Sequence, residues 1–235
     1  MGRVTVAGGN PGMKVPTTGI QAGTLAVGST VKLMESGTAV EYLVVNQGIP
    51  SNSNLYDSSC NGTWLLRKYI HSLRQWNSSD TTDYGNSSVN TWLNGDFFNA
   101  LGRVEQSVIK QVKIPYYDWN GGNNTSNLSC KVFLLGGCEA GWAKVSYFPT
   151  DGAKVDYFIE GEGEIANDKR IAYLNSNRRE DWWLRSRITN YDAVHYVTFE
   201  GEYSWNPASD SYGIRPALIL PSTAKFDATT MLLKG

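Results

Sequence analysis

Several features are scarce or absent in this chain of 235 residues, and each narrows the functions open to it. Its three cysteines, Cys60, Cys130 and Cys138, are too few and too scattered for a disulfide-stapled domain, so free thiols are expected. With His71 and His195 as the only histidines, a zinc site of Cys and His ligands is not expected. No apolar run reaches the roughly 18 residues of a membrane span. We therefore expect no metal, no cofactor and no membrane-spanning segment.

The chain also has no marked excess of positive or negative charge. The 21 basic and 22 acidic residues nearly cancel, and no basic face is visible along the chain, so nucleic acid is not an expected partner. Residues 1–23 are rich in Gly, Pro and Thr, lack periodicity and carry no apolar signal core. We interpret them as a flexible or partner-docked leader ahead of a single domain over residues 24–235.

The domain begins and ends with strand patterns. Residues 30–46, TVKLMESGTAVEYLVVN, alternate around a Ser-Gly turn and predict a hairpin, and residues 61–76 predict further strand pieces. Residues 118–127 and 158–170 have the composition of surface loops.

Helical spacing is confined to the middle of the chain. Ser87 or Ser88 can cap a helix whose apolar face comprises Val89, Trp92 and Leu93, and Gly95 is expected to end it. Short helices over 96–101 and 103–112 follow. The order of strands, short helices and strands predicts an α+β fold.

The segment 189–213, TNYDAVHYVTFEGEYSWNPASDSYG, contains no Leu, Ile, Met, Lys or Arg but four Tyr and one Trp. We expect a strand over 193–201 and a long return loop over 201–213, with Val194, Val197 and Ala208 facing inward. Exposed Tyr and Trp among short polar residues are typical of a ligand-binding surface. The candidate contact residues are Thr189, Asn190, Tyr191, Asp192, His195, Tyr196, Thr198, Glu200, Tyr203, Trp205, Asn206, Ser209 and Ser211. The alternative is that these rings belong to the core of an aromatic-rich β domain.

Four motifs occur in a recognisable order: SSVNTWLNGDFFNAL, CKVFLLGGCEAG, DWWLRSR and GIRPALIL. Over about residues 24–221 the chain resembles the C-type-lectin-fold variable proteins of diversity-generating retroelements. In that family the segment between the Trp-Leu-Arg-Ser strand and the Gly-x-Arg-Pro motif is rewritten by adenine-directed mutagenesis. The resemblance implies a C-type-lectin-like fold with a variable segment at about 187–211. Arg187 departs from the pattern, because members often carry Pro there.

The resemblance also implies roles. Residues 182–186 and 213–216 would be scaffold, and the residues between them would contact a protein or other ligand on the surface of a target cell. Mutation of the adenines in Asn codons can produce many of the residue types found in 189–211. It cannot produce Glu200, Glu202 or Trp205. Members are often phage tail or bacterial cell-surface proteins, whose display is commonly multivalent, so a homo-oligomer is an open alternative.

Alternative functions rest on weaker patterns. His195 lies three residues from Asp192, but no Ser in the chain lies in a nucleophile-elbow motif. An exposed contact role for His195 is therefore favoured over catalysis. Glu160, Glu162 and Glu164 offer the oxygen ligands that Ca²⁺ prefers, but a solvated acidic turn is the favoured interpretation. An undiversified adhesion module of the same fold remains an alternative. An enzyme related to sulfatase-modifying enzymes is disfavoured, because the cysteines match no motif of that class.

Overall fold

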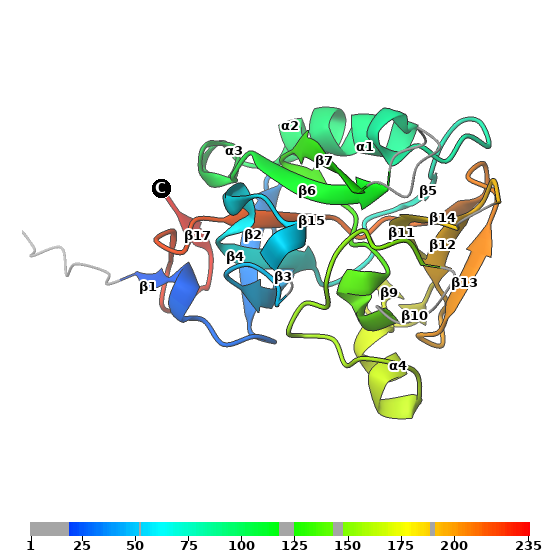
Figure 1. Ribbon diagram of the computed structural model, residues 1–235. Helices are drawn as coiled ribbons and strands as arrows, with labels where there is room; N and C mark the ends of the chain where they lie inside the picture. The colour runs from blue at the N-terminus through cyan, green and yellow to red at the C-terminus, as the bar shows by residue number, and fades with distance from the viewer. Residues whose placement is uncertain (1–18, 52, 118–124, 143–147, 189–190) are drawn as a thin grey trace, which may run out of the picture.

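The computed structural model describes residues 19–51, 53–117, 125–142, 148–188 and 191–235 (Figure 1). Within these ranges the strands form two five-stranded sheets and three smaller sheets, combined with short helices. The predicted α+β class is therefore confirmed. Their helices include none that is long and apolar enough to cross a lipid bilayer.

The first five-stranded sheet has the order β2-β3-β4-β15-β8. Its strands are β2 (Thr30–Glu35), β3 (Thr38–Gln47), β4 (Thr63–Arg67), β15 (Ala217–Leu220) and β8 (Val132–Phe133). All neighbours are antiparallel. Side chains of β4 and β15 are almost all buried, so this sheet lies at the centre of the core.

The predicted hairpin at 30–46 is confirmed as β2 and β3. Ser36 and Gly37 form its turn with φ of 47° and 81°. Positive φ at both central residues matches the right-handed twist of the paired strands, which is why a Gly stands at the second position.

The second five-stranded sheet has the order β13-β12-β11-β14-β5 and forms one side of the molecule (Figure 1). Its strands are β13 (Tyr203–Asn206), β12 (Val194–Val197), β11 (Trp182–Arg187), β14 (Ser211–Gly213) and β5 (Leu73–Gln75). Only the β11–β14 contact is parallel among these described strands. The predicted loop over 201–213 is therefore wrong, because β13 and β14 lie within it.

A helical layer covers the β6–β7 side of the molecule (Figure 1). Its segments are α1 (Ser88–Trp92), the π-helix η5 (Leu93–Phe97), α2 (Phe98–Ala100) and α3 (Arg103–Val108). Ser87 caps α1, since its hydroxyl accepts the Asn90 backbone N–H at 3.2 Å. The expectation that Gly95 ends this helix is wrong: the helix continues through a π turn. Nothing lies within 4 Å of where a Gly95 Cβ would be.

Small elements complete the domain. Three two-stranded contacts are made by β6 (Val112–Tyr117) with β7 (Thr125–Cys130), β9 (Tyr173–Leu174) with β10 (Arg178–Arg179), and β16 (Lys225–Phe226) with β17 (Leu233–Lys234). The remaining helices are η1 (Ala22–Thr24), η2 (Ser53–Leu55), η3 (Ser58–Cys60), η4 (Tyr84–Asn86), the π-helix η6 (Cys138–Trp142) and α4 (Glu164–Arg170). The predicted loop over 158–170 thus ends in a helix. Of the loop predicted over 118–127, residues 125–127 belong to β7 and the rest lie outside the described residues.

The end of the predicted leader is packed against the domain. β1 (Ile20–Gln21) pairs with β16, and the buried Ala22 donates its backbone N–H to the Ala224 carbonyl at 2.8 Å. The packed domain therefore starts before residue 24. Residues 1–18 of the leader lie outside the described residues.

Tryptophan fills much of the core. Among the described residues five indoles are fully buried, namely Trp64, Trp76, Trp142, Trp182 and Trp183. These five indoles belong to the core, so an exposed large ring is the exception that needs a reason.

Candidate functional site

The candidate site is built on β11, whose residues 182–186 are all buried. Trp182 and Trp183 donate their indole N–H groups to the Arg170 and Arg74 carbonyls at 2.9 and 3.0 Å. Residues 213–216 are buried as well. Both motifs that flank the segment of interest therefore form a rigid frame, as expected of a scaffold.

A buried ion pair ties this frame to η6. The Arg185 guanidinium donates to both carboxylate oxygens of Glu139, at 2.6 and 2.8 Å, and neither side chain is exposed. The same guanidinium donates to the carbonyls of Leu134 and Pro115 at 2.9 and 3.1 Å. Tyr56 donates its hydroxyl to Glu139 at 3.0 Å. Arg185 therefore holds the scaffold together and is not exposed to a ligand.

A second carboxylate, Asp151, lies beside this pair. It accepts the Ser186 hydroxyl at 2.6 Å, while its other oxygen has no hydrogen-bond partner among the described residues. Burial raises the pKa of Asp151 to about 6, although the nearby Arg185 guanidinium acts in the opposite direction. The folded protein therefore favours the protonated form of Asp151 more than the unfolded chain does.

We expect Asp151→Asn to change how stability depends on pH. In the folded protein the pKa of Asp151 is raised above its unfolded value. The stabilisation that protonated Asp151 gives the folded state is therefore fully present below about pH 4 and is lost as pH rises through about 6. The asparagine does not titrate, so the variant should gain on the wild type by about 2 kcal/mol in free energy of unfolding between pH 4 and pH 7. Urea unfolding at several pH values measures this difference. A difference that is constant across that window would contradict the assignment.

His195 is buried and is not a contact residue. It is 0% exposed, and its ring stacks on Phe148 with centroids 3.9 Å apart. The prediction of an exposed His195 is therefore wrong. The physical reason is that Phe148, far earlier in the chain, covers this face of β12, which local sequence does not reveal.

Two other predicted contact residues are partly buried in aromatic clusters. On the face of His195, Tyr203 packs edge-on against Phe148 and Trp142, with centroids 5.3 and 5.7 Å away. On the opposite face, Tyr196 stacks on Tyr212 at 4.4 Å. These rings support the sheet on both sides, which leaves them only part of their surface for a ligand.

Trp183 joins the second cluster. It packs against Tyr196 at 5.9 Å and Tyr212 at 4.7 Å, and the Asn206 amide donates to the Tyr212 hydroxyl. Burial, followed by the effect of the neighbouring Tyr196, raises the pKa of Tyr212 to about 12. Tyr212 therefore remains neutral at physiological pH and acts as a packing and hydrogen-bonding group.

Two exposed rings of the segment lie close together. Tyr191 is 63% exposed and Trp205 is 51% exposed, and their nearly parallel rings lie with centroids 6.4 Å apart. We call them the aromatic pair. Trp205 belongs to β13, where it lies opposite the buried His195 of β12. Trp205 therefore sits on a strand whose neighbour is locked into the core, while Tyr191 lies in the bend that precedes β12.

The other predicted contact residues are spread over the sheet. Val194, Val197 and Ala208 are fully buried, as predicted. The exposed candidates are Asp192, Glu200 and Ser211, and the partly exposed ones are Thr198, Asn206 and Ser209. Thr198 and Glu200 belong to the β12–β13 turn, at the far end of the hairpin from the aromatic pair. Thr189 and Asn190 lie outside the described residues.

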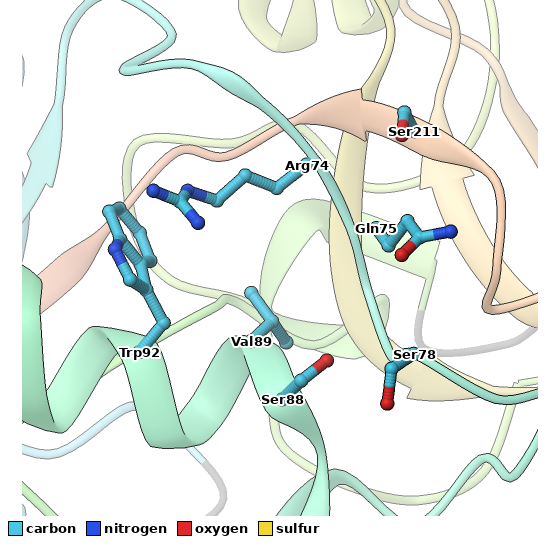
Figure 2. Close-up of a pocket in the computed structure, with 7 residues that line it drawn as sticks. All are labelled: Arg74, Gln75, Ser78, Ser88, Val89, Trp92 and Ser211. Carbon is cyan, nitrogen blue, oxygen red and sulfur yellow. The ribbon is translucent and has the colours of Figure 1, made fainter.

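A pocket that sequence reasoning missed lies at the β5 edge of the same sheet (Figure 2). It has a volume of about 440 Å³ and is lined by Arg74, Gln75, Ser78, Ser88, Val89, Trp92 and Ser211. We call it the Arg74 pocket. Trp92 was predicted as helix core, but it is half-buried and lines this pocket. Its spacing from Val89 did predict a shared helix face. The pocket on that face depends on the distant β5.

The described part of the chain has neither clustered metal-ligating side chains nor exposed thiols. It contains no group of three or more His, Cys, Asp or Glu side chains placed to hold a metal ion. All three cysteines are free and buried. Burial raises the pKa of Cys60 to about 11 and that of Cys130 and Cys138 to about 12, so reactive thiolates are scarce at neutral pH.

Comparisons with known proteins give one result. Neither the curated proteins nor the solved structures yielded a match. A family profile described as "Domain of unknown function (DUF6273)" matches residues 61–222, which is more than half of the chain. That stretch includes β11, the hairpin of β12 and β13, and the Arg74 pocket. The chain belongs to the DUF6273 family.

Proposed function

We propose that this protein is a binding protein that recognises a partner molecule through the aromatic pair. The observation that carries the proposal is the exposure of the neighbouring rings of Tyr191 and Trp205, although His195, the cross-strand partner of Trp205, is fully buried. Large rings that are already held in place lose little conformational entropy when they bind, and each contributes a few kcal/mol when a partner covers it.

The charge and chemistry around the pair agree with recognition. Asp192 is exposed next to Tyr191, so a carboxylate stands beside one ring of the pair. Short polar groups of this kind add hydrogen bonds and selectivity around an aromatic anchor. The partner that fits is a protein or other ligand displayed on a cell surface.

The proposal extends to the origin of the segment. The motifs shared with variable proteins of diversity-generating retroelements suggest a C-type-lectin-like fold with a diversified surface at about 187–211, displayed on a phage tail or a bacterial cell. A rigid β11 and buried residues 213–216 support this, because a changeable surface needs a frame that does not depend on it.

We expect Tyr191→Ala combined with Trp205→Ala to lower cell binding at least tenfold, since the aromatic anchor is lost. The measurement is flow cytometry of labelled protein on a panel of bacterial strains. The free energy of unfolding should fall by less than about 1 kcal/mol, because both rings are exposed.

The matched control is Phe199→Ala. Phe199 is 50% exposed and lies in the turn at the other end of the hairpin, so its replacement removes an exposed aromatic ring away from the pair. Equal loss of binding in the control and the double variant would argue against the aromatic pair.

For diversification, the test is genomic: a reverse transcriptase and a near-copy of the DNA encoding 182–216 that differs at adenines should lie nearby.

A further inference from the structure

The Arg74 pocket lies between β5 and α1, away from the aromatic pair. Figure 2 shows the Arg74 side chain extending from β5 toward the indole of Trp92 on α1, with Ser78 and Ser88 at the other end. The buried side chain of Val89 lies at its base. The pocket is thus a polar hollow with an apolar floor.

Arg74 is held in position without being neutralised. Its guanidinium carbon lies 4.1 Å from the centre of the Trp92 ring, and that ring is fixed in turn by His71 and Phe97, at 5.2 and 5.4 Å. Among the described residues, no carboxylate or other acceptor pairs with this guanidinium. Arg74 is also the sole charged side chain among the residues that line the pocket. A planar fork of donors stacked on an indole is suited to a carboxylate.

The rest of the lining offers hydrogen bonds to hydroxyl groups. Three hydroxyls come from Ser78, Ser88 and Ser211. The Gln75 amide nitrogen donates to the Ser209 carbonyl at 2.7 Å, which directs the amide and leaves its oxygen as an acceptor. Such a lining pairs with a ligand that carries several hydroxyl groups as well as a negative charge.

A second hollow continues the first. It has a volume of about 420 Å³ and shares Ser78, Ser88 and Trp92 with the Arg74 pocket. Its other lining residues are Asn77, Asn86, Thr91, Gly95 and Asp96. The two hollows form a polar groove along α1 in which Trp92 is common to both and the positive charge stands at one end.

From these contacts we infer that the Arg74 pocket binds a polyhydroxylated carboxylate of monosaccharide size, the chemistry of a uronic acid. The carboxylate pairs with the Arg74 guanidinium, and the hydroxyls bond to the serines and Gln75. The apolar face of the ligand packs on Val89 and Trp92. This site does not depend on the aromatic pair, and it would remain if the proposed function were wrong.

The test is an NMR titration of ¹⁵N-labelled protein with D-glucuronate, D-glucose and inorganic phosphate through the millimolar range. We expect D-glucuronate to give saturable shifts of the Arg74 Nε–H and Trp92 Nε1–H signals. D-glucose should bind about tenfold more weakly, because it lacks the carboxylate. Equal affinity for glucose, or no saturable shift with glucuronate, would overturn the assignment. Equal affinity for phosphate would also overturn it, by showing a simple anion site.

Arg74→Gln supplies the residue-level test. It should weaken D-glucuronate binding about tenfold and cost less than about 1 kcal/mol of stability, since the exposed contact with Trp92 contributes little. Arg103→Gln makes the same change of charge on α3, at an exposed residue that does not line the pocket, and should leave binding unchanged. Equal loss in both variants would show that only net charge matters.

Discussion

Replacing Glu139 by alanine is expected to lower the free energy of unfolding by about 3–5 kcal/mol, the range for breaking a buried ion pair. The substitution leaves the Arg185 guanidinium without either of its carboxylate contacts, at 2.6 and 2.8 Å, in a place with no exposure to water. Tyr56 and the Gly136 backbone N–H lose their acceptors on the same carboxylate. Urea unfolding at neutral pH measures the loss.

Glu41→Ala is the control for this prediction. Glu41 pairs with Lys68 at 2.9 Å, but both side chains are about one third exposed. Exposed pairs contribute little, so the loss should stay below about 1 kcal/mol. Similar losses for Glu41 and Glu139 would mean that the buried network does not organise this part of the fold.

Gly213→Ala is expected to lower the free energy of unfolding by about 3 kcal/mol, at the upper end of the cost of overpacking a core. A Cβ at Gly213 would lie 2.6 Å from the Asp181 carbonyl oxygen and 2.8 Å from two side-chain carbons of Ile70. The same residue donates its backbone N–H to that carbonyl at 2.9 Å, so the backbone cannot move away without losing the bond. The glycine of the GIRP motif is thus required by close packing between β14 and β11. Thermal unfolding measures the effect.

Gly95→Ala makes the identical change where the surroundings are open. Nothing lies within 4 Å of its Cβ position in the helical layer, so alanine should raise stability by about 0.5–1 kcal/mol. Opposite signs at the two glycines are the expected result. A loss at Gly213 no larger than at Gly95 would contradict the packing argument.

Local patterns in the sequence predicted what depends on neighbouring residues. Alternation and the Ser-Gly turn predicted the β2–β3 hairpin, and a serine ahead of Val89 predicted the cap of α1. The scaffold role of residues 182–186 was implied by the family resemblance, and all five are buried. Each of these features is decided within a few residues, so the chain itself contains the information.

Features that depend on distant segments were missed. His195 looked exposed because its cover, Phe148, belongs to a different part of the chain. The strands β13 and β14 looked like loop because their pairing with β12 and β5 supplies the hydrogen bonds that short polar segments cannot organise alone. The Arg74 pocket requires β5, α1 and Ser211 together.

The pairing of β4 with β15 joins Thr63 to Leu220, and that of β5 with β14 joins Leu73 to Gly213. Neither sheet can form completely until the chain has been synthesised to about Gly213 in one case and Leu220 in the other. Strands β4 and β5 therefore have unpaired edges during synthesis, until β15 and β14 have been made. Contacts between residues so far apart in the sequence also make folding slow. Yield in a heterologous host should accordingly respond to slower translation or added chaperone more than to surface substitutions.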